Sequence, residues 1–167
     1  MTRAWVSVGS NIDREANILA ALTAMERRFG TLKVSRVYRT APVGFEGEDF
    51  YNLVAGFETG ESPLEVARVL RKIEDARGRE RGGRKFSPRT LDLDLLLYGD
   101  LVVDLDGISL PRDEILRYAF VLGPLAEIAA ATIHPVEGRR IGDLWAEFEI
   151  GEGQLTPVSL SWVPDRT

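Results

Sequence analysis

The sequence predicts an α+β protein in which four antiparallel strands and two helices follow one another in the order βαββαβ. Short runs rich in β-branched and aromatic residues predict the strands, and apolar residues at helical spacing predict the helices. The chain has 167 residues, the size of one ordinary domain. Hydrophobic residues make up 44% and charged residues 28%, a balance that supports a globular core.

The first half of the chain predicts a strand, a helix and two further strands. Residues 4–8 form the first strand, and Gly30 ends the helix that follows it. Strands are predicted at 32–38 and 50–58, joined by a loop over 39–49 that is rich in Gly, Pro and acids. The helix places four apolar residues on one face: Ile18, Leu22, Met25 and Phe29.

The second half predicts a helix, a strand and a helical extension. Residues 62–65, Ser-Pro-Leu-Glu, form a capping box with Pro at the first helical position. The helix ends around Gly78, a strand follows at 91–98, and a short strand or hairpin arm follows at 101–103. This order is the ferredoxin-like arrangement, a four-stranded antiparallel sheet with both helices on one face. Residues 111–148 are predicted to be mainly helical and to extend this unit.

One domain over residues 1–150 and a C-terminal tail over 151–167, punctuated by Pro and Gly, are predicted. The net charge is −5 and the pI is near 5.0, the opposite sign to most nucleic-acid-binding proteins, so no nucleic-acid partner is expected. Residues 71–89 nevertheless carry eight basic and three acidic residues. This segment suits a small anionic ligand, the alternative being a solvated charged loop.

The chain has no cysteine, which excludes disulfides and thiolate metal sites and is typical of a cytoplasmic protein. Its first nine residues contain no long apolar segment, so no signal peptide is expected. No apolar run approaches the roughly 20 residues that span a membrane, so no membrane partner is expected either.

Two carboxylates, Asp92 and Asp94, stand two residues apart in the predicted strand 91–98. Alternate residues of a strand face the same side, so both carboxylates project from one face. Such a pair is costly to desolvate, because the two charges repel each other. Mg²⁺ is typically held by one or two carboxylates together with phosphates and water. The pair therefore predicts a metal site, the alternative being a strand face whose acids simply meet water.

Basic residues stand just before this pair, and they favour the metal interpretation. Acids for a metal beside bases for phosphates are typical of a site for a nucleotide triphosphate. The sequence has no G-x-x-x-x-G-K-[ST] motif, so a P-loop enzyme is excluded. The basic residues are Arg79, Arg81, Arg84, Lys85 and Arg89.

Segment 85–96 resembles the signature of the hydroxymethyldihydropterin pyrophosphokinases, in which a basic residue precedes P-R-x-x-D-L-D and an aliphatic run. Other family motifs follow in the expected order, and the resemblance runs from about residue 4 to about residue 145. These motifs are Gly9-Ser10-Asn11, the Y-R-T-x-P-x-G of residues 38–44, Phe50-Tyr51-Asn52, Ile73-Glu74 with Gly78-Arg79, and Phe120-Val121-Leu122 with Pro124-Leu125.

The resemblance implies a monomeric folate-pathway enzyme that transfers pyrophosphate from ATP to 6-hydroxymethyl-7,8-dihydropterin and releases AMP. It implies that two Mg²⁺ ions are held by Asp92 and Asp94. The expected catalytic residues are Arg79, Arg89, Asp92 and Asp94. The expected nucleotide-binding residues are Glu74, Arg81, Lys85 and Arg112. The expected pterin-binding residues are Thr40, Val43, Phe50, Asn52, Phe86 and Phe120.

Each of these roles has a plainer alternative. Phe50 and Phe120 would sandwich the pterin ring, but a lone Phe is more often part of a core. Asn52 is harder to explain structurally, because a buried amide needs hydrogen-bonding partners. His134, the only histidine, is given no catalytic role.

The chain departs from the family pattern after the signature. Arg112 stands where the family has a nucleotide-contacting His, and Tyr118 stands where it has a phosphate-contacting Arg, with Arg117 one position early. Two other interpretations therefore stay open. One is a diverged paralogue that acts on another pterin or phosphate donor, and the other is a non-catalytic ferredoxin-like binding module.

Overall fold

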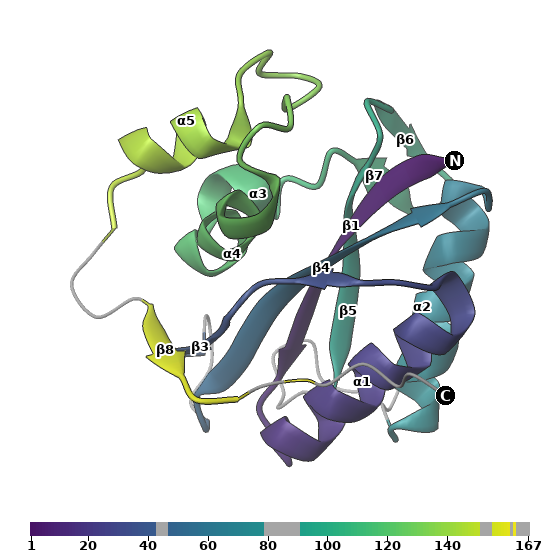
Figure 1. Ribbon diagram of the computed structural model, residues 1–167, viewed down its shortest axis with the longest axis vertical. Helices are drawn as coiled ribbons and strands as arrows, with labels where there is room; N and C mark the ends of the chain where they lie inside the picture. Colours follow the sequence, from purple (N-terminus) through teal and green to yellow (C-terminus); the bar gives the residue numbers. More distant parts are fainter. Residues whose placement is uncertain (43–46, 79–90, 151–154, 161, 163–167) are drawn as a thin grey trace.

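The computed structural model of the protein describes residues 1–42, 47–78, 91–150, 155–160 and 162. Its centre is an antiparallel sheet in the order β5-β1-β4-β3-β8, with β2 also paired to β4 (Figure 1). The strands are β1 (Thr2–Ser10), β2 (Lys33–Val34), β3 (Val37–Thr40), β4 (Phe50–Thr59), β5 (Asp92–Tyr98) and β8 (Thr156–Val158). The α+β class and the antiparallel sheet are therefore confirmed.

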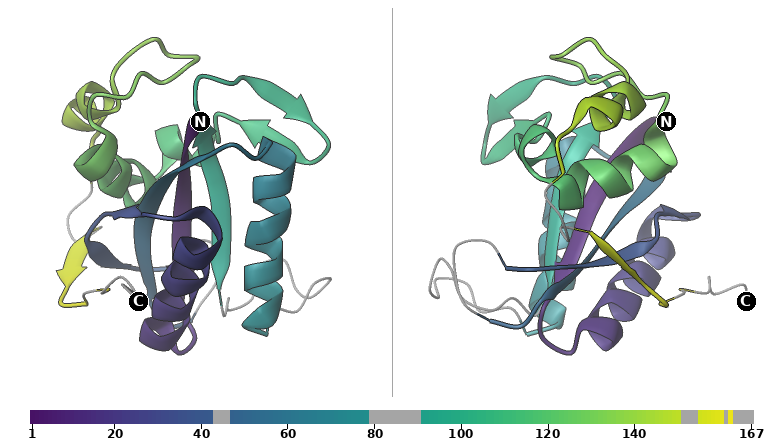
Figure 2. Two further views of the ribbon diagram at one scale, coloured as in Figure 1. Left: turned by 45° about the vertical axis from the view of Figure 1, so that its right-hand side comes forward. Right: turned by 90° about the vertical axis from the view of Figure 1, so that its left-hand side faces the viewer.

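Helices α1 (Arg14–Phe29) and α2 (Pro63–Ala76) cover one face of this sheet (Figure 2). The N-cap of the predicted capping box begins α2, where the Ser62 hydroxyl accepts a hydrogen bond from the Glu65 backbone N–H at 3.2 Å, while the Glu65 carboxylate pairs with Arg28 and Arg68. A buried apolar cluster joins the two helices to the sheet, and burial of this apolar area is the main stabilisation of the layer. Its large, fully buried members include Ile18, Leu22, Met25, Leu53, Phe57 and Leu70.

The opposite face carries a second helical layer made of α3 (Glu114–Arg117), α4 (Ala119–Ala129) and α5 (Ile141–Glu147) (Figure 2). Trp5 of β1 projects into this layer beside Val54 of β4. The Trp5 ring lies so close to Gly56 that an added Cβ there would be 2.2 Å from it, so this strand position requires glycine. The predicted helical region thus covers the face that α1 and α2 leave open.

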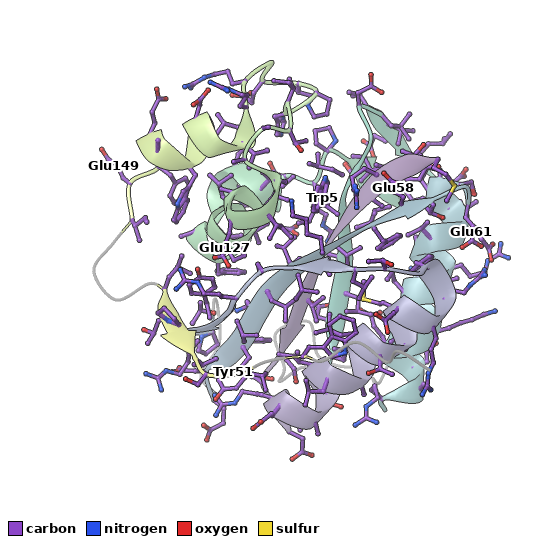
Figure 3. All side chains as sticks on the ribbon, viewed as in Figure 1. Trp5, Tyr51, Glu58, Glu61, Glu127 and Glu149 are labelled. Carbon is purple, nitrogen blue, oxygen red and sulfur yellow. The ribbon has the colours of Figure 1, made fainter. Side chains whose placement is uncertain are left out.

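Glu127 of α4 connects this layer to β3 (Figure 3). Its carboxylate accepts hydrogen bonds from the Tyr38 hydroxyl and, at 2.7 Å, from the Arg36 backbone N–H. Hydrogen bonds to a charged acceptor are stronger than neutral ones. The contact therefore fixes α4 against the strand that ends at Thr40.

The strand predicted over 32–38 is wrong as a single element, because it is divided into β2 and β3. Val34 pairs with Ala55 and Tyr38 pairs with Asn52, so this side uses one residue more than β4 over the same length. The extra residue interrupts the ladder as a bulge does. Ser35 compensates for the interruption, since its hydroxyl accepts a hydrogen bond from the Val54 N–H at 2.9 Å.

A separate hairpin of β6 (Val103–Leu105) and β7 (Ile108–Leu110) replaces the short arm predicted over 101–103. Asp106 and Gly107, with φ of 56° and 79°, form its two-residue turn. Asp-Gly is the usual sequence of such a turn.

In the segment predicted as a tail, β8 pairs with β3 and extends the main sheet. No helix within the described ranges is both long enough and apolar enough to span a membrane.

Candidate active site

Three neighbouring strands align candidate residues in one row across the sheet. Gly9 of β1 pairs with Asp92 of β5 on one side and with Asn52 of β4 on the other. Residues paired directly across antiparallel strands face the same side, and strands lie about 4.8 Å apart, so the Cα atoms of Asp92 and Asn52 are roughly 10 Å apart. Gly9 has no side chain, so the Asn52 amide can lie close to the Gly9 backbone.

The next row places Asp94 on the same face as Asp92. Asp94 pairs with Ser7, which also pairs with Val54, and Val54 packs in the cluster beneath α4. Both carboxylates therefore project on the α4 side of the sheet, as the strand period predicts. Leu91, Leu93 and Leu95 belong to the cluster on the opposite side, also as predicted.

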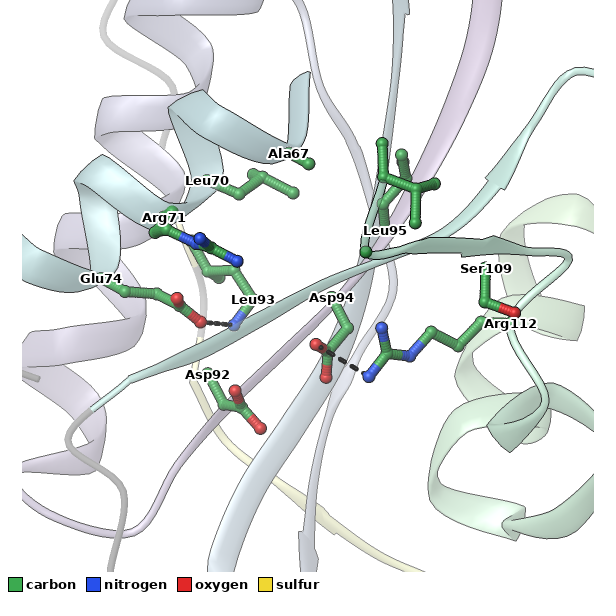
Figure 4. Close-up of a pocket in the computed structure, with 12 residues that line it drawn as sticks. Ala67, Leu70, Arg71, Glu74, Asp92, Leu93, Asp94, Leu95, Ser109 and Arg112 are labelled. Carbon is green, nitrogen blue, oxygen red and sulfur yellow. Dashed lines mark hydrogen bonds and ion pairs between the residues drawn. The ribbon is translucent and has the colours of Figure 1, made fainter. Parts of the chain in front are cut away.

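A pocket of about 240 Å³ runs along the outer edge of β5 (Figure 4). It lies between α2, β5, the start of β7 and Arg112 in the segment after β7. In its lining, Arg112 forms an ion pair with Asp94 at 3.4 Å. Residues that line the pocket include Arg71, Glu74, Asp92, Asp94, Ser109 and Arg112.

The Asp94 carboxyl is electrostatically unfavourable as an anion. Burial and then the Asp92 charge raise its pKa from 3.8 to about 7, and the Arg112 charge opposes this shift. A cation beside the pair would favour the ionised form. The described residues contain no group of three or more His, Cys, Asp or Glu side chains placed to hold a metal. Two carboxylates are sufficient for Mg²⁺ where phosphates and water complete the coordination, so the donor set fits.

Glu74, predicted to face the nucleotide, lines this pocket but is also part of its frame. Its Oε2 accepts a hydrogen bond from the Leu93 backbone N–H at 2.7 Å, and the residue is only 6% exposed. The bond satisfies a backbone donor at the edge of the sheet and ties α2 to β5 (Figure 4).

The other end of the row is neutral and tightly packed. The Asn52 Nδ2 donates a hydrogen bond to the Thr40 Oγ1 at 2.6 Å, and both residues are 5% exposed. A Cβ added at Gly9 would be 2.8 Å from the Asn52 Oδ1 and 3.8 Å from the Phe50 ring. The structure therefore brings together three predicted pterin-binding residues, Thr40, Phe50 and Asn52. It also identifies Gly9 as the position that makes room for the amide.

The sequence profile of the family 7,8-dihydro-6-hydroxymethylpterin-pyrophosphokinase (HPPK) matches residues 5–130. The chain belongs to this family. Among its relatives, the 2-amino-4-hydroxy-6-hydroxymethyldihydropteridine pyrophosphokinase of Pseudomonas aeruginosa is 39% identical over 148 residues, which cover 86% of this chain and 90% of the relative. The Haemophilus influenzae protein of the same name is 36% identical over 139 residues, which cover 81% and 86%.

Solved structures of HPPK proteins share the fold. Plasmodium falciparum HPPK-DHPS, wild type with pteroate, superposes with a TM-score of 0.69 at 16% identity, over 87% of this chain and 42% of that one. The chain thus spans less than half the length of the Plasmodium protein. At this identity the likeness concerns the fold alone.

Phe120, the second predicted stacking residue of the HPPK family, lies at the start of α4. Its ring stacks on that of Tyr118, with centroids 5.0 Å apart and an interplanar angle of 18°. The Arg117 guanidinium lies over the other ring of this pair, 5.3 Å from the Tyr118 centroid, and its Nη1 also pairs with Asp113 at 3.0 Å. Tyr118, which replaces the expected Arg, therefore packs against the Phe120 ring. No motif around Phe120 indicates this stack.

Glu114 and His134 also form side-chain hydrogen bonds in the described region. Glu114 accepts a hydrogen bond from the Arg112 Nε at 2.8 Å, a contact that sequence reasoning missed, because it depends on how the chain turns after β7. His134 is 2% exposed, and its Nδ1 accepts hydrogen bonds from the backbone N–H groups of Val136 and Glu137. Burial lowers the pKa of His134, as suits an imidazole that accepts two hydrogen bonds in a turn.

Six predicted site residues lie outside the described residues. They belong to segments 43–46 and 79–90, so their roles stay predictions. They are Val43, Arg79, Arg81, Lys85, Phe86 and Arg89.

Proposed function

We propose that the protein transfers a pyrophosphoryl group from ATP to the hydroxymethyl group of 6-hydroxymethyl-7,8-dihydropterin, releasing AMP, in folate biosynthesis. Membership of the HPPK family supports this activity. The observation that carries it here is the row of Asp92, Gly9 and Asn52. The Cα atoms of a carboxylate residue for the metal–nucleotide complex and of an amide residue for a heterocycle are roughly 10 Å apart on one face, with Gly9 between them.

In this reaction the pterin hydroxymethyl oxygen forms a bond to the β-phosphorus of ATP. The bond from that phosphorus to the oxygen bridging to the α-phosphorus breaks, AMP leaves with the electron pair, and the hydroxyl proton is released to water. The chain contributes mainly position and charge, because phosphoryl transfer asks little covalent chemistry of the protein. Asn52 binds the pterin edge with help from the backbone of Thr40 and Val43, Phe50 and Phe120 flank the ring, and Phe86 closes over it.

Asp92 and Asp94 would hold two Mg²⁺ ions, whose chemistry when bound is to neutralise developing charge on the phosphate oxygens. Arg112 donates to the nucleotide phosphates from the pocket side. Glu74 keeps the β5 edge in place beside the nucleotide. Arg79, Arg81, Lys85 and Arg89 supply the remaining positive charge.

Several finer assignments belong to the same proposal. The order β1-α1-β3-β4-α2-β5 is the ferredoxin-like arrangement, with the later helices as its extension. Residues 1–150 are the catalytic domain, and residues 151–167 are a C-terminal segment whose β8 supports the edge of the sheet. The protein works as a cytoplasmic monomer on ATP and a dihydropterin, without nucleic-acid or membrane partners.

A direct assay tests the activity. The protein is incubated with ATP, Mg²⁺ and 6-hydroxymethyl-7,8-dihydropterin, and the nucleotide and pterin products are separated by chromatography. AMP and the pterin diphosphate in equal amounts are expected. Release of ADP would indicate transfer of a single phosphoryl group instead. No pterin-dependent release of either nucleotide, from folded protein at high concentration, would contradict the proposal.

A further inference from the structure

Arg112 lies between two carboxylates, the candidate metal ligand Asp94 and the neighbouring Glu114. Its Nη2 is 3.4 Å from the Asp94 Oδ1, and its Nε is 2.8 Å from the Glu114 Oε2. The first distance is an ion pair too long for a good hydrogen bond, and the second is a charge-assisted hydrogen bond of ordinary length. The contact with Asp94 is therefore the weaker of the two, and the easier to release.

The backbone of Arg112 is fixed while its side chain is accessible. The Arg112 N–H donates to the Leu96 carbonyl at 2.9 Å, which docks this segment on the free edge of β5. The Arg112 side chain is 35% exposed, and those of Asp94 and Glu114 are 28% and 31% exposed. Water reaches this partly exposed ion pair, so the pair is weaker than a fully buried one and can exchange. The guanidinium can thus change partners by side-chain rotation alone.

The charges around the pocket determine when that exchange is favourable. A divalent cation next to Asp94 would lie beside the positive Arg112, so the two compete for one carboxylate and repel each other. Nucleotide phosphates reverse the sign of this interaction, because they attract both the cation and the guanidinium. Arg112 therefore opposes a bare metal ion and supports a metal–nucleotide complex.

We propose that Arg112 is the countercharge of Asp94 in the unliganded protein, and that it releases Asp94 to the metal–nucleotide complex while keeping Glu114. Binding of divalent metal alone is thereby suppressed, and metal and nucleotide bind with positive coupling. This inference rests on the proposed metal and nucleotide site. This chain has Arg at a position where the HPPK family pattern has His. The proposed exchange of Arg112 between partners is therefore specific to chains with this Arg.

The test measures metal binding without turnover. Mn²⁺ binding is followed by electron paramagnetic resonance at pH 8.5, first alone and then with a non-hydrolysable ATP analogue. The proteins compared are the wild type, Arg112→Ala, Arg112→Lys and a control, Arg139→Ala. Arg139 forms an ion pair with Glu147 at 2.8 Å on the surface, far from the pocket in sequence. Thermal unfolding checks that each variant is folded.

The expected results have opposite signs for the two ligands. Arg112→Ala should bind Mn²⁺ alone about tenfold more tightly and the Mn²⁺–analogue complex about tenfold more weakly, with Arg112→Lys between it and the wild type. Arg139→Ala should match the wild type in both measurements. A residue that only contacts phosphate would leave binding of Mn²⁺ alone unchanged in Arg112→Ala. A merely structural residue would weaken both, and either result overturns the inference.

Failure here is distinguishable from failure of the proposed function. If neither the wild type nor Arg112→Ala binds Mn²⁺ with or without the analogue, the metal site itself is wrong and both proposals are overturned. If the opposite shifts are observed but the pterin assay gives no product, Arg112 has the inferred role and the substrate assignment is wrong.

Discussion

The two ends of the row across β5, β1 and β4 are built on different physical principles. The acid end has two like charges on an edge strand, and a burial that raises the pKa of Asp94 to about 7. The amide end has no ionised group among Thr40, Gly9 and Asn52, and it is held by a 2.6 Å hydrogen bond and close packing. The acid end should therefore respond to changes of charge, pH and metal. The amide end should respond to the addition of as little as one methyl group.

Binding of a triphosphate and binding of a flat heterocycle require side chains with different properties. Charge compensation for a triphosphate needs groups that can exchange partners, and the side chains of Asp94 and Arg112 remain partly exposed. Recognition of a flat heterocycle needs donors and acceptors that do not move, and Asn52 and Thr40 are almost fully buried. Preorganised polar groups lose little order when a ligand binds. One face of the sheet thus combines an adaptable end with a rigid one.

The largest effect is expected from Asp94→Asn. Loss of this carboxylate removes one of the two candidate metal ligands, so pterin-dependent AMP release should fall by about 10³-fold or more. The folded state should be retained, because a neutral amide at this site avoids the repulsion from Asp92.

Turnover and thermal unfolding of this variant are measured beside those of Asp104→Asn, which changes an exposed acid on β6. Turnover in Asp94→Asn like that of the wild type would rule out the metal assignment.

Gly9→Ala tests the amide end by volume alone. The new Cβ would lie 2.8 Å from the Asn52 Oδ1, and the amide cannot move away without losing its bond to Thr40. A displacement of the recognition group should raise KM for the pterin by about 10²-fold, with a loss of about 1–3 kcal/mol in unfolding free energy. The dissociation constant of the ATP analogue should stay unchanged.

The control for Gly9→Ala is Gly60→Ala, where the added Cβ would meet only the Met1 side chain at 3.5 Å, an ordinary contact. Steady-state kinetics and calorimetry separate the two ligands. An equal loss for pterin and nucleotide would mean that the ends of the row are not independent.

The pH dependence of the acid end follows from Asp94. Its pKa is raised from 3.8 to about 7 on folding, so between these values the native state holds a proton that the unfolded state has lost. The free energy of unfolding without metal should therefore decrease as pH rises from about 4 to about 7 and then level off. Because a proton competes with the metal, Mn²⁺ affinity should fall about tenfold per pH unit below pH 7.

Chemical denaturation at several pH values and Mn²⁺ titrations measure both slopes. In Asp94→Asn, the contribution of the Asp94 titration to both slopes should be absent. The same slopes in wild type and Asp94→Asn would assign the titration to another group. Pterin affinity, which depends on the neutral end, should not follow either slope.

The smallest effect is expected from Thr40→Val, which removes the acceptor of the Asn52 Nδ2 while keeping the side-chain shape. A buried amide without its partner costs about 1–3 kcal/mol of unfolding free energy, and the freed side chain should raise KM for the pterin about fivefold. Thr40→Ser retains the hydroxyl and serves as the control. Equal kinetics in the two variants would mean that the hydroxyl does not orient Asn52.

Local patterns were read correctly where the deciding contacts are near in sequence. The N-cap at Ser62 and the shared face of Asp92 and Asp94 depend on a few neighbouring residues, so period and propensity are sufficient. The division of 32–38 into β2 and β3 was missed, because it depends on the register against β4 and on the Ser35 side chain. The Asp106-Gly107 turn carried a sequence signal for the β6–β7 hairpin, which the prediction over 101–103 did not use.

By itself, the sequence determined the class of the fold and the family and proposed the residues of the two ends of the site, because strand period, caps and family motifs are properties of short segments. Only the tertiary structure decided that Gly9 lies between Asp92 and Asn52, since strand register is set by packing of the whole sheet. It also decided that Arg112 pairs with Asp94 and Glu114, and that Tyr118 stacks on Phe120. These contacts depend on how the segment after β7 docks on the edge of β5, and no local pattern encodes that docking.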